Sequence, residues 1–521
     1  MAPGTEGRAR LAIVLHAHIP RVRIHGMRFP LQELWLYQSM LECYIPLLRM
    51  LERLRADAVP VTLTLSVSPP LLSMLADDYY SKKFDDYLTV LGELLEGVRT
   101  RLGRDAARAV DSIAARIGEA RSWKERHGSD LARAVARLDG EGIELVTSSA
   151  THAYLPAWRH APGLVKLQVE AGLRCFREIT GVSPTGFWLP EMGYYSGLDR
   201  VLADAGIEYT FLSAHSLYTT PTVPPTGNFF PAVTGAGLRV FPRDAGLSDQ
   251  VWSRSAGYPG DERYREFHFD CSWDLPDEER IARGVPRGLF GLKIFRITGG
   301  DRPKEYYDPE AASEAVREHV DAFMGAVRDR AREVRGLTGV DPVFTLPFDL
   351  ELFGHWWFEG TDFLEGVFRE AARSGDLALA APGDFADTAG LPLVVPAESS
   401  WGRGGYGSTW LNPRVMDIYR KVSGLYARFR GMAHGVDGAH LYAGMWELLL
   451  AQSSDWSFGI DQESFSEYFM GRIEDHLGAA ERIAGMLEQG MDDADFSERR
   501  LAALGGLARP RGAACWPYAE F

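Results

Sequence analysis

The sequence predicts an α/β fold in which parallel βα units form a barrel, with a helical insertion and a C-terminal all-helical domain. Short apolar runs recur along the first three quarters of the chain, and amphipathic segments with helical spacing separate them. Polar or aromatic residues directly follow several of these runs. A barrel of parallel strands carries its active site at that end of the strands, so the pattern favours a barrel over an open sheet.

The expected strands are continuous apolar runs, as in parallel strands that are buried on both faces. They cover residues 11–15, 61–67, 143–147, 186–189, 209–212 and 343–348. Amphipathic helices are expected over residues 31–55, 164–180 and 313–337. No Gly-x-Gly-x-x-Gly turn follows the first strand, so the pattern does not indicate a dinucleotide site.

Two regions depart from this alternation. Residues 71–138 are rich in Arg, Ala, Leu and Glu and have a helical pattern almost throughout, which predicts a helical insertion on one βα loop. From about residue 401 no strand is expected, and helices are expected over 414–432, 438–452 and 465–486. We therefore expect a catalytic barrel domain over 1–395 and a C-terminal helical domain over 396–521 that contributes to the substrate groove.

Net charge, cysteine spacing and the length of the first apolar run indicate which partners and which cell compartment to expect. The formal net charge is −15 and the chain has no basic run, which argues against a nucleic acid partner and suits a neutral or cationic ligand. The four cysteines, Cys43, Cys175, Cys271 and Cys515, lack the paired spacing of a zinc or redox site and are expected to be reduced thiols. The first apolar run is too short for a signal peptide or a membrane span, so we expect a cytoplasmic protein.

Two stretches place a carboxylate among aromatic rings. Glu191 lies within residues 187–195, and Asp349 lies within 347–357. Cleavage of a glycosidic bond requires two carboxyl groups, one to attack or stabilise the sugar carbon and one to protonate the leaving oxygen. Each stretch alone could also be a core strand capped by a solvated acid. Glu351 shares the second stretch and is a rival for the acid role.

His16 and His18 are two residues apart at the end of the first strand and would share a face. Such a pair could bind a metal, with His152 or Asp349 as a further ligand, which raises the possibility of a metal-dependent deacetylase. The chain has no His-x-x-x-His and no cluster of acids beside the pair. Hydrogen bonding to sugar hydroxyls is the favoured interpretation, and no metal or cofactor is predicted.

A set of ordered motifs resembles a known family. The motifs are His16-Ala17-His18-Ile19-Pro20, Ala150-Thr151-His152-Ala153-Tyr154-Leu155-Pro156, Trp188-Leu189-Pro190-Glu191, Gln250-Val251-Trp252-Ser253, Gly257-Tyr258-Pro259-Gly260-Asp261, Asp349-Leu350-Glu351-Leu352-Phe353-Gly354-His355-Trp356-Trp357 and Gln452-Ser453-Ser454-Asp455-Trp456. The chain resembles the family-57 glycoside hydrolases, and most closely their α-1,4-glucan branching enzymes. This resemblance implies an incomplete (β/α)7 barrel with an inserted helical domain and a C-terminal helical domain.

The resemblance also implies roles for individual residues. Glu191 would be the nucleophile and Asp349 the general acid/base of a retaining double displacement, which requires the two carboxyl groups to lie about 5 to 5.5 Å apart. The remaining residues expected to contact substrate are His16, His18, His152, His355 and Asp455, with Trp273, Trp401 and Trp410 as aromatic platforms. The expected partner is an α-glucan such as amylose or a glycogen-like polymer, without membrane contact, and the oligomeric state is left open.

Four functions remain open at this stage. Branching members of the family carry a loop tyrosine over the site, but residues 219–257 contain no tyrosine and Tyr258 is the nearest candidate. A branching enzyme is therefore the first interpretation, with an α-amylase or 4-α-glucanotransferase of the same family as the alternative. A non-catalytic glucan-binding protein and the metal-dependent deacetylase complete the set.

Overall fold

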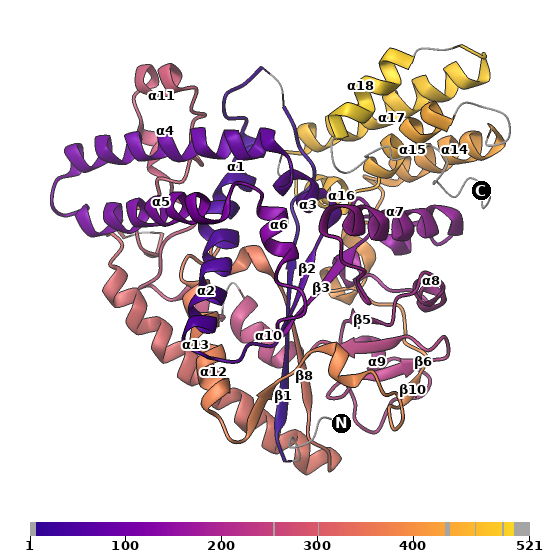
Figure 1. The fold of residues 1–521 in the computed structure, drawn as a ribbon, viewed down its shortest axis with the longest axis horizontal. Helices are drawn as coiled ribbons and strands as arrows, with labels where there is room; N and C mark the ends of the chain where they lie inside the picture. The colour runs from indigo at the N-terminus through magenta and orange to yellow at the C-terminus, as the bar shows by residue number, and fades with distance from the viewer. Residues whose placement is uncertain are drawn as a thin grey trace. The chain divides into compact units, whose positions relative to one another are not determined.

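The computed structural model describes residues 7–24, 26–253, 256–300, 302–432, 438–463, 465–491 and 494–504 (Figure 1). The chain divides into two compact units. The first unit comprises Met1–Leu65, Asp77–Glu144 and Asp244–Ala386, and the second comprises Ser66–Ala76, Leu145–Arg243 and Asp387–Phe521. Strands β2 (Leu63–Val67) and β3 (Ile143–Ser148) begin in the first unit and end in the second.

The sheet of the first unit is parallel and buried. Strand β1 (Ala9–Ala17) pairs in parallel with β8 (Val343–Asp349) and with the short β9 (Leu377–Leu379). Nearly every residue of β1 and β8 is buried, as expected for strands covered on both faces. The register sets His16 opposite Asp349, so two predicted site residues end neighbouring strands.

The first unit also contains α-helices. They are α1 (Leu31–Ser39), α2 (Ile45–Ala56), α4 (Asp78–Leu102), α5 (Ala107–His127), α6 (Leu131–Ala136), α10 (Ala245–Trp252), α11 (Asp277–Arg283), α12 (Pro309–Thr338) and α13 (Gly360–Arg373). The long helices α4 and α5 lie side by side (Figure 1) and occupy most of the stretch in which a helical insertion was predicted. The helix predicted over 31–55 is present as α1 and α2, joined by a π-helical turn at Met40–Tyr44.

Local sequence signals set the helix ends. Helix α12 begins at Pro309, which suits the first helical position, and the Asp308 side chain accepts a hydrogen bond from the Glu310 N–H. It ends at Gly339, whose φ of 73° is left-handed. Asp77 caps α4 in the same way by accepting from the Tyr79 N–H. These caps explain why the predicted and observed bounds of α12 differ by only a few residues.

The second unit contains a mixed sheet. Strands β3, β4 (Gly186–Trp188), β5 (Tyr209–Leu212) and β7 (Arg239–Pro242) pair in parallel in that order. Beyond β7, β6 (Ala232–Thr234) pairs antiparallel, and β10 (Leu393–Val394) pairs in parallel with β6. The helices of this part are α3 (Pro69–Leu75), α7 (Pro162–Thr180), α8 (Leu198–Asp204) and α9 (His215–Tyr218). Strands β6, β7, β9 and β10 were not predicted.

The C-terminal part of the second unit is helical. It contains α14 (Met416–Met432), α15 (Gly438–Leu450), α16 (Ser454–Asp461), α17 (Ser466–Glu488) and α18 (Ala494–Leu504). Helix α15 contacts α14, α17 and α18, and these helices cluster together in Figure 1. After β10, the described part of the chain contains no strand, as predicted. Helices α16 and α18 were not predicted.

The predicted fold class, parallel βα units with an additional C-terminal helical region, is confirmed. The contact-based units cross the boundary proposed at residue 395, and the division into a 1–395 domain and a 396–521 domain stays a prediction. Cys43, Cys175 and Cys271 carry free thiols, whereas Cys515 lies outside the described residues. Among the described helices, none combines the length and apolar character needed to cross a bilayer.

Candidate active site

Glu191 lies in a strained turn that follows β4. A 3-10 turn, Pro190–Met192, comes two residues after the strand, and Glu191 has a φ of 59° and Met192 a φ of 50°. His152, which follows β3, has a φ of 57°. Left-handed backbone in residues other than glycine costs about 1–3 kcal/mol and persists where the surroundings enforce it, commonly at active sites. This strain marks Glu191 and His152 as functional candidates independently of any motif.

Hydrogen bonds from Trp401 and Ser454 hold the Glu191 carboxylate. The Trp401 indole N–H donates to Oε2 at 2.9 Å, and the Ser454 hydroxyl donates to Oε1 at 2.9 Å. The backbone N–H of Trp401 also donates to the Glu191 carbonyl at 3.1 Å, which anchors the turn itself. Hydrogen bonds to both oxygens stabilise a charged carboxylate and limit its rotation. The arrangement suits an ionised nucleophile with one fixed orientation.

His152 and Ser454 form a second layer around this carboxylate. His152 is buried, and its Nδ1 lies 2.9 Å from the Ser454 hydroxyl and 3.9 Å from Glu191 Oε1. Because Ser454 gives its single proton to Glu191, the hydrogen bond to His152 assigns a proton to Nδ1. The His152 carbonyl in turn accepts from the Ser454 N–H at 3.0 Å. Ser454 therefore ties the start of α16 to the turn that carries Glu191.

Asp455 follows Ser454 and is half-buried. Its Oδ2 accepts a hydrogen bond from the Ser453 hydroxyl at 2.7 Å, which fixes the carboxylate at the first turn of α16. A helix N-terminus stabilises such a charge. Asp455 is thus held on the same helix as the residue that binds Glu191.

The two predicted platforms of this region differ in their surroundings. Trp401 is half-buried, with its ring edge-on to Trp188 at 5.2 Å between centroids. Trp410 is fully buried and stacks on Tyr154 at 4.7 Å. A Cβ at Gly402 would lie 2.4 Å from the Trp410 ring, so glycine permits this close packing. Trp401 contacts the candidate nucleophile directly, while Trp410 is packed in the interior.

Asp349 ends β8 in the first unit. It is half-buried, whereas every other residue of the strand is buried. His16, its neighbour in the register, is buried and stacks against the His18 ring with centroids 6.1 Å apart and an interplanar angle of 18°. The first unit therefore holds a partly accessible carboxyl beside two imidazoles at the ends of parallel strands, which is where a barrel binds substrate.

Glu351 occupies a different environment from Asp349. It is buried, and its Oε1 accepts hydrogen bonds from the Tyr44 hydroxyl at 2.6 Å and from the His18 backbone N–H at 3.1 Å. Burial raises the pKa of Glu351 to about 7. These contacts anchor the Glu351 side chain to Tyr44 and to the His18 backbone, and they favour Asp349 as the residue that meets substrate.

His355 belongs to a buried charge network. Its Nδ1 lies 3.1 Å from Glu42, and Arg265 pairs with the same carboxylate at 2.5 Å. Burial alone would raise the pKa of Glu42, but Arg265, the buried Lys293 and His355 hold it below its usual value. Burial lowers the pKa of His355. Glu42 and Tyr44 both come from the π-helical turn, a feature often found at functional sites.

Tyr258 and Trp273 were predicted to contact substrate from the first unit. Tyr258 is half-buried, donates to Gln250 Oε1 at 3.0 Å, and stacks on His319 at 4.6 Å. Trp273 is 49% exposed. Its ring packs over Gly288, which has a φ of 78° and whose Cβ would lie 2.2 Å from the indole. The Trp273 ring is therefore open to a ligand, while Tyr258 is held by its packing.

Comparison with known proteins places these motifs in a family. The family model described as glycosyl hydrolase family 57 matches residues 12–279, just over half of the chain. The chain belongs to glycosyl hydrolase family 57. A second model, described as the C-terminal region of 1,4-alpha-glucan branching enzymes, matches residues 417–504.

Several known proteins match along almost the whole chain. The α-amylase AmyC of Thermotoga maritima is 31% identical, with a TM-score of 0.87 and coverage of 96% of this chain and 99% of AmyC. The branching enzyme of Pyrococcus horikoshii is 30% identical, with a TM-score of 0.85 and coverage of 96% of this chain and 97% of that enzyme. A Mycobacterium tuberculosis protein named "Probable 1,4-alpha-glucan branching enzyme" is 32% identical over 94% of both chains.

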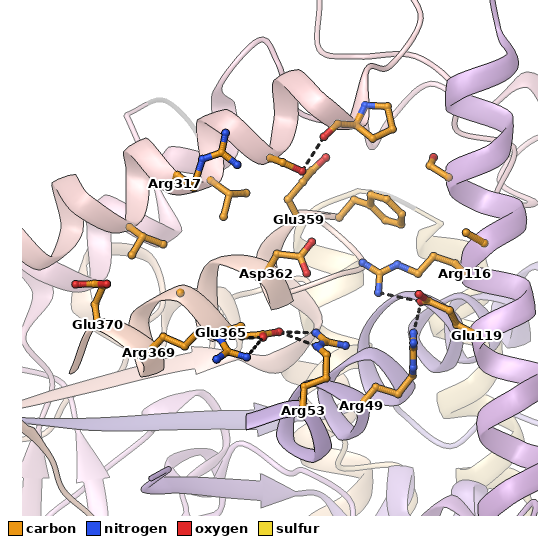
Figure 2. Close-up of a pocket in the computed structure, with 18 of the residues that line it drawn as sticks. Arg49, Arg53, Arg116, Glu119, Arg317, Glu359, Asp362, Glu365, Arg369 and Glu370 are labelled. Atoms are coloured by element: carbon orange, nitrogen blue, oxygen red, sulfur yellow. Dashed lines mark hydrogen bonds and ion pairs between the residues drawn. The ribbon is translucent and has the colours of Figure 1, made fainter. Parts of the chain in front are cut away.

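The family-57 chain also contains a pocket of about 830 Å³ in its first unit, between α2, α5, α12 and α13 (Figure 2). Charged side chains on its walls pair with one another: Arg53 and Arg369 with Glu365, and Arg49 with Glu119. Among the described residues, none that was predicted to bind or cleave a glucan lines it. The pocket is therefore distinct from the candidate active-site residues.

Sequence reasoning missed three functional candidates in this family-57 protein. Ser454 was not predicted to have a role, yet its hydroxyl donates a hydrogen bond to the Glu191 carboxylate. Glu42 and Tyr44 lie in the middle of a predicted helix, and nothing in the apolar pattern set them apart. The one available signal was the presence of an acid, Glu42, at a position where the helix faces the interior.

The buried carboxyl of Glu351 predicts a pH-dependent stability. Because its pKa in the folded protein, about 7, lies above the ordinary value of 4.5, its contribution to stability is complete below pH 4.5 and is lost as pH rises toward 7. The loss is on the order of 3 kcal/mol. Glu351→Gln removes the titrating group and keeps an acceptor for Tyr44. We expect the melting temperature of the variant, relative to the parent, to rise between pH 5 and pH 8.

The matched control is Glu310→Gln, since the Glu310 side chain is 82% exposed. Its melting temperature should follow that of the parent at every pH. Parallel curves for Glu351→Gln and the parent between pH 5 and pH 8 would contradict the burial argument.

Proposed function

We propose that this family-57 protein is a 1,4-α-glucan branching enzyme, which cleaves an α-1,4 linkage and transfers the freed chain to a 6-hydroxyl of a glucan. One observation carries the proposal. Ser454 lies within residues 417–504, the part that matches the branching-enzyme C-terminal model, and its hydroxyl hydrogen-bonds the carboxylate of Glu191. The region that is similar to branching enzymes thus supplies a direct contact to the candidate nucleophile.

The mechanism that we propose is a retaining double displacement. Glu191 attacks the anomeric carbon while protonated Asp349 gives its proton to the leaving glycosidic oxygen, so the C–O bond breaks and a glycosyl-enzyme forms. Asp349, now ionised, then takes the proton of an acceptor 6-hydroxyl, whose oxygen attacks the same carbon and releases Glu191. This chemistry requires the two carboxyl groups to flank one glycosidic bond, about 5 to 5.5 Å apart.

The surroundings of each carboxyl group support these roles. Glu191 receives hydrogen bonds on both oxygens, as an ionised nucleophile needs. Asp349 is the partly accessible residue at the end of an otherwise buried strand. We propose that the imidazoles of His16, His18 and His152, with Asp455, hydrogen-bond hydroxyls of the sugar at the cleaved bond. Trp401 and Trp273 would lie against pyranose faces and exclude the water that competes with the acceptor.

Hydrolysis is the second candidate function. The α-amylase AmyC is as similar to this chain as the branching enzymes are, and Tyr258 is packed on His319 instead of standing on an open loop. An α-amylase shares the first half of the mechanism, and water replaces the 6-hydroxyl in the second half. The acceptor alone therefore separates the two functions.

Incubation with linear amylose distinguishes the candidates. We expect the product to gain α-1,6 linkages, measured as new reducing ends after treatment with a debranching enzyme, with little free reducing sugar before it. Reducing sugar without branches would instead support an α-amylase, and linear chains of redistributed length a 4-α-glucanotransferase. Loss of activity in a chelator, with recovery on adding back metal, would support the deacetylase class.

A further inference from the structure

Two tryptophans of the first unit, Trp252 and Trp356, form an aromatic corner on its surface. Their ring centroids lie 5.9 Å apart and their planes meet at 75°. Trp356 is 41% exposed and Trp252 is half-buried. Neither residue has a role in the mechanism proposed above, although Trp252 lies in the motif at 250–253 and Trp356 in the motif at 349–357. We call this pair the aromatic corner.

The exposure of Trp356 is enforced by its neighbours. His355 on one side is held by Glu42, and Trp357 on the other is buried against Phe363, with ring centroids 5.0 Å apart. The Trp356 N–H donates to the Glu351 carbonyl at 3.1 Å. Both flanking side chains and the backbone at Trp356 are therefore anchored, and the Trp356 ring lies partly exposed between them. A ring held at a fixed place at the surface offers a preformed apolar area that the apolar face of a ligand can cover.

Trp252 belongs to a helix that packs against β8, the strand that ends in Asp349. It is the last residue of α10, which contacts β8. The backbone N–H of Asp244, just before α10, donates to the Thr345 carbonyl of β8 at 2.9 Å, and the Asp244 side chain caps the helix by accepting from the Leu247 N–H. The aromatic corner and the candidate general acid therefore belong to one unit and are anchored to the same strand.

We propose that the aromatic corner is an additional glucan-binding subsite, which takes one glucosyl residue of a polymeric chain. The C–H face of a pyranose is apolar and matches an indole face, while its hydroxyl rim stays in water. Two rings close to a right angle would cover both a face and an edge of the sugar, which gives orientation as well as contact area. The inference rests on the proposed action on α-glucan and extends it to binding away from the reacting bond.

The test is retention in native gels that contain amylopectin, together with calorimetric titration by maltoheptaose, on the full chain. We expect Trp356→Ala to raise the dissociation constant by about tenfold, equivalent to about 1.4 kcal/mol. Trp356→Phe keeps a ring and should restore most of the affinity. Leu337→Ala, which removes a 75% exposed side chain from α12, is the matched control and should bind as the parent does.

Three results would overturn the subsite. They are a parent that the gel does not retain, a Trp356→Ala variant that binds as tightly as the parent, and equal weakening by Trp356→Ala and Leu337→Ala. The readout needs no turnover, so it separates this inference from the proposed function. A parent that binds glucan through Trp356 without forming branches would contradict the branching activity and leave the subsite in place.

A kinetic readout adds a second check. If the aromatic corner binds chain away from the reacting bond, Trp356→Ala should raise the KM for long amylose several-fold and leave kcat unchanged. Maltooligosaccharides too short to reach from the reacting bond to the aromatic corner should have the same KM and kcat with the variant as with the parent. An equal fall of kcat on short and long substrates would show that Trp356 acts at the reacting bond, and would overturn the subsite.

Discussion

Glu191→Gln is expected to reduce glucan transfer by at least about 10⁴-fold, equivalent to about 5.4 kcal/mol of activation free energy. The amide that replaces the carboxylate cannot form the glycosyl-enzyme, so the covalent route closes. The fold should survive because the change is nearly isosteric and Ser454 can rotate its hydroxyl to accept from the amide. Branch formation on amylose and the melting temperature measure the two effects.

Glu191→Ala assigns the role by stereochemistry. With α-maltosyl fluoride as donor, azide can occupy the space left by the side chain and displace fluoride in one step, which yields the inverted β-maltosyl azide. Glu398→Gln is the matched control in the same unit, since the Glu398 carboxylate is 47% exposed and pairs with Arg159 at the surface. It should keep full activity. A retained α-azide from Glu191→Ala, or near-normal turnover by Glu191→Gln, would rule out Glu191 as the nucleophile.

The sequence predicted which residue of this turn bears the charge but not how the turn is built. The acid could be predicted because it directly follows an apolar run, and carboxylates are rare in buried segments. The left-handed backbone of Glu191 could not be predicted from the sequence, since residues other than glycine rarely adopt a positive φ. It is maintained by partners 210 and 263 residues away, Trp401 and Ser454, and contacts at that separation leave no trace in local spacing.

The same distinction applies to the fold. Long elements such as α7 and α12 were predicted within a few residues, because three or more turns of amphipathic spacing give a clear period. Strands β6 and β10 were missed because they are defined by pairing with each other and with β7, and local sequence spacing does not encode that pairing. The π-helical turn at Met40–Tyr44 was also missed, since an apolar segment masks a local change of period.

Asp349→Asn is expected to lower kcat/KM on amylose by about 10²–10⁴-fold, the range typical of a lost general acid. The sugar alkoxide is a poor leaving group and must be protonated as the bond breaks, whereas fluoride is not. Cleavage of α-maltosyl fluoride should therefore suffer much less than cleavage of amylose. Initial rates on the two donors, compared as a ratio between variant and parent, measure this difference.

Azide completes the assignment of the acid. In Asp349→Ala the glycosyl-enzyme should form from the fluoride and then accept azide in place of a deprotonated hydroxyl, so the product is the retained α-maltosyl azide. Glu351→Gln is the matched control. Glu351 is buried and accepts a hydrogen bond from the His18 backbone N–H, so its loss should leave the ratio of the rates on the two donors unchanged. If Glu351→Gln instead showed the large selective loss on amylose and Asp349→Asn did not, Glu351 would be the general acid. The pH dependence of kcat/KM would then follow the pKa of about 7 that burial gives Glu351.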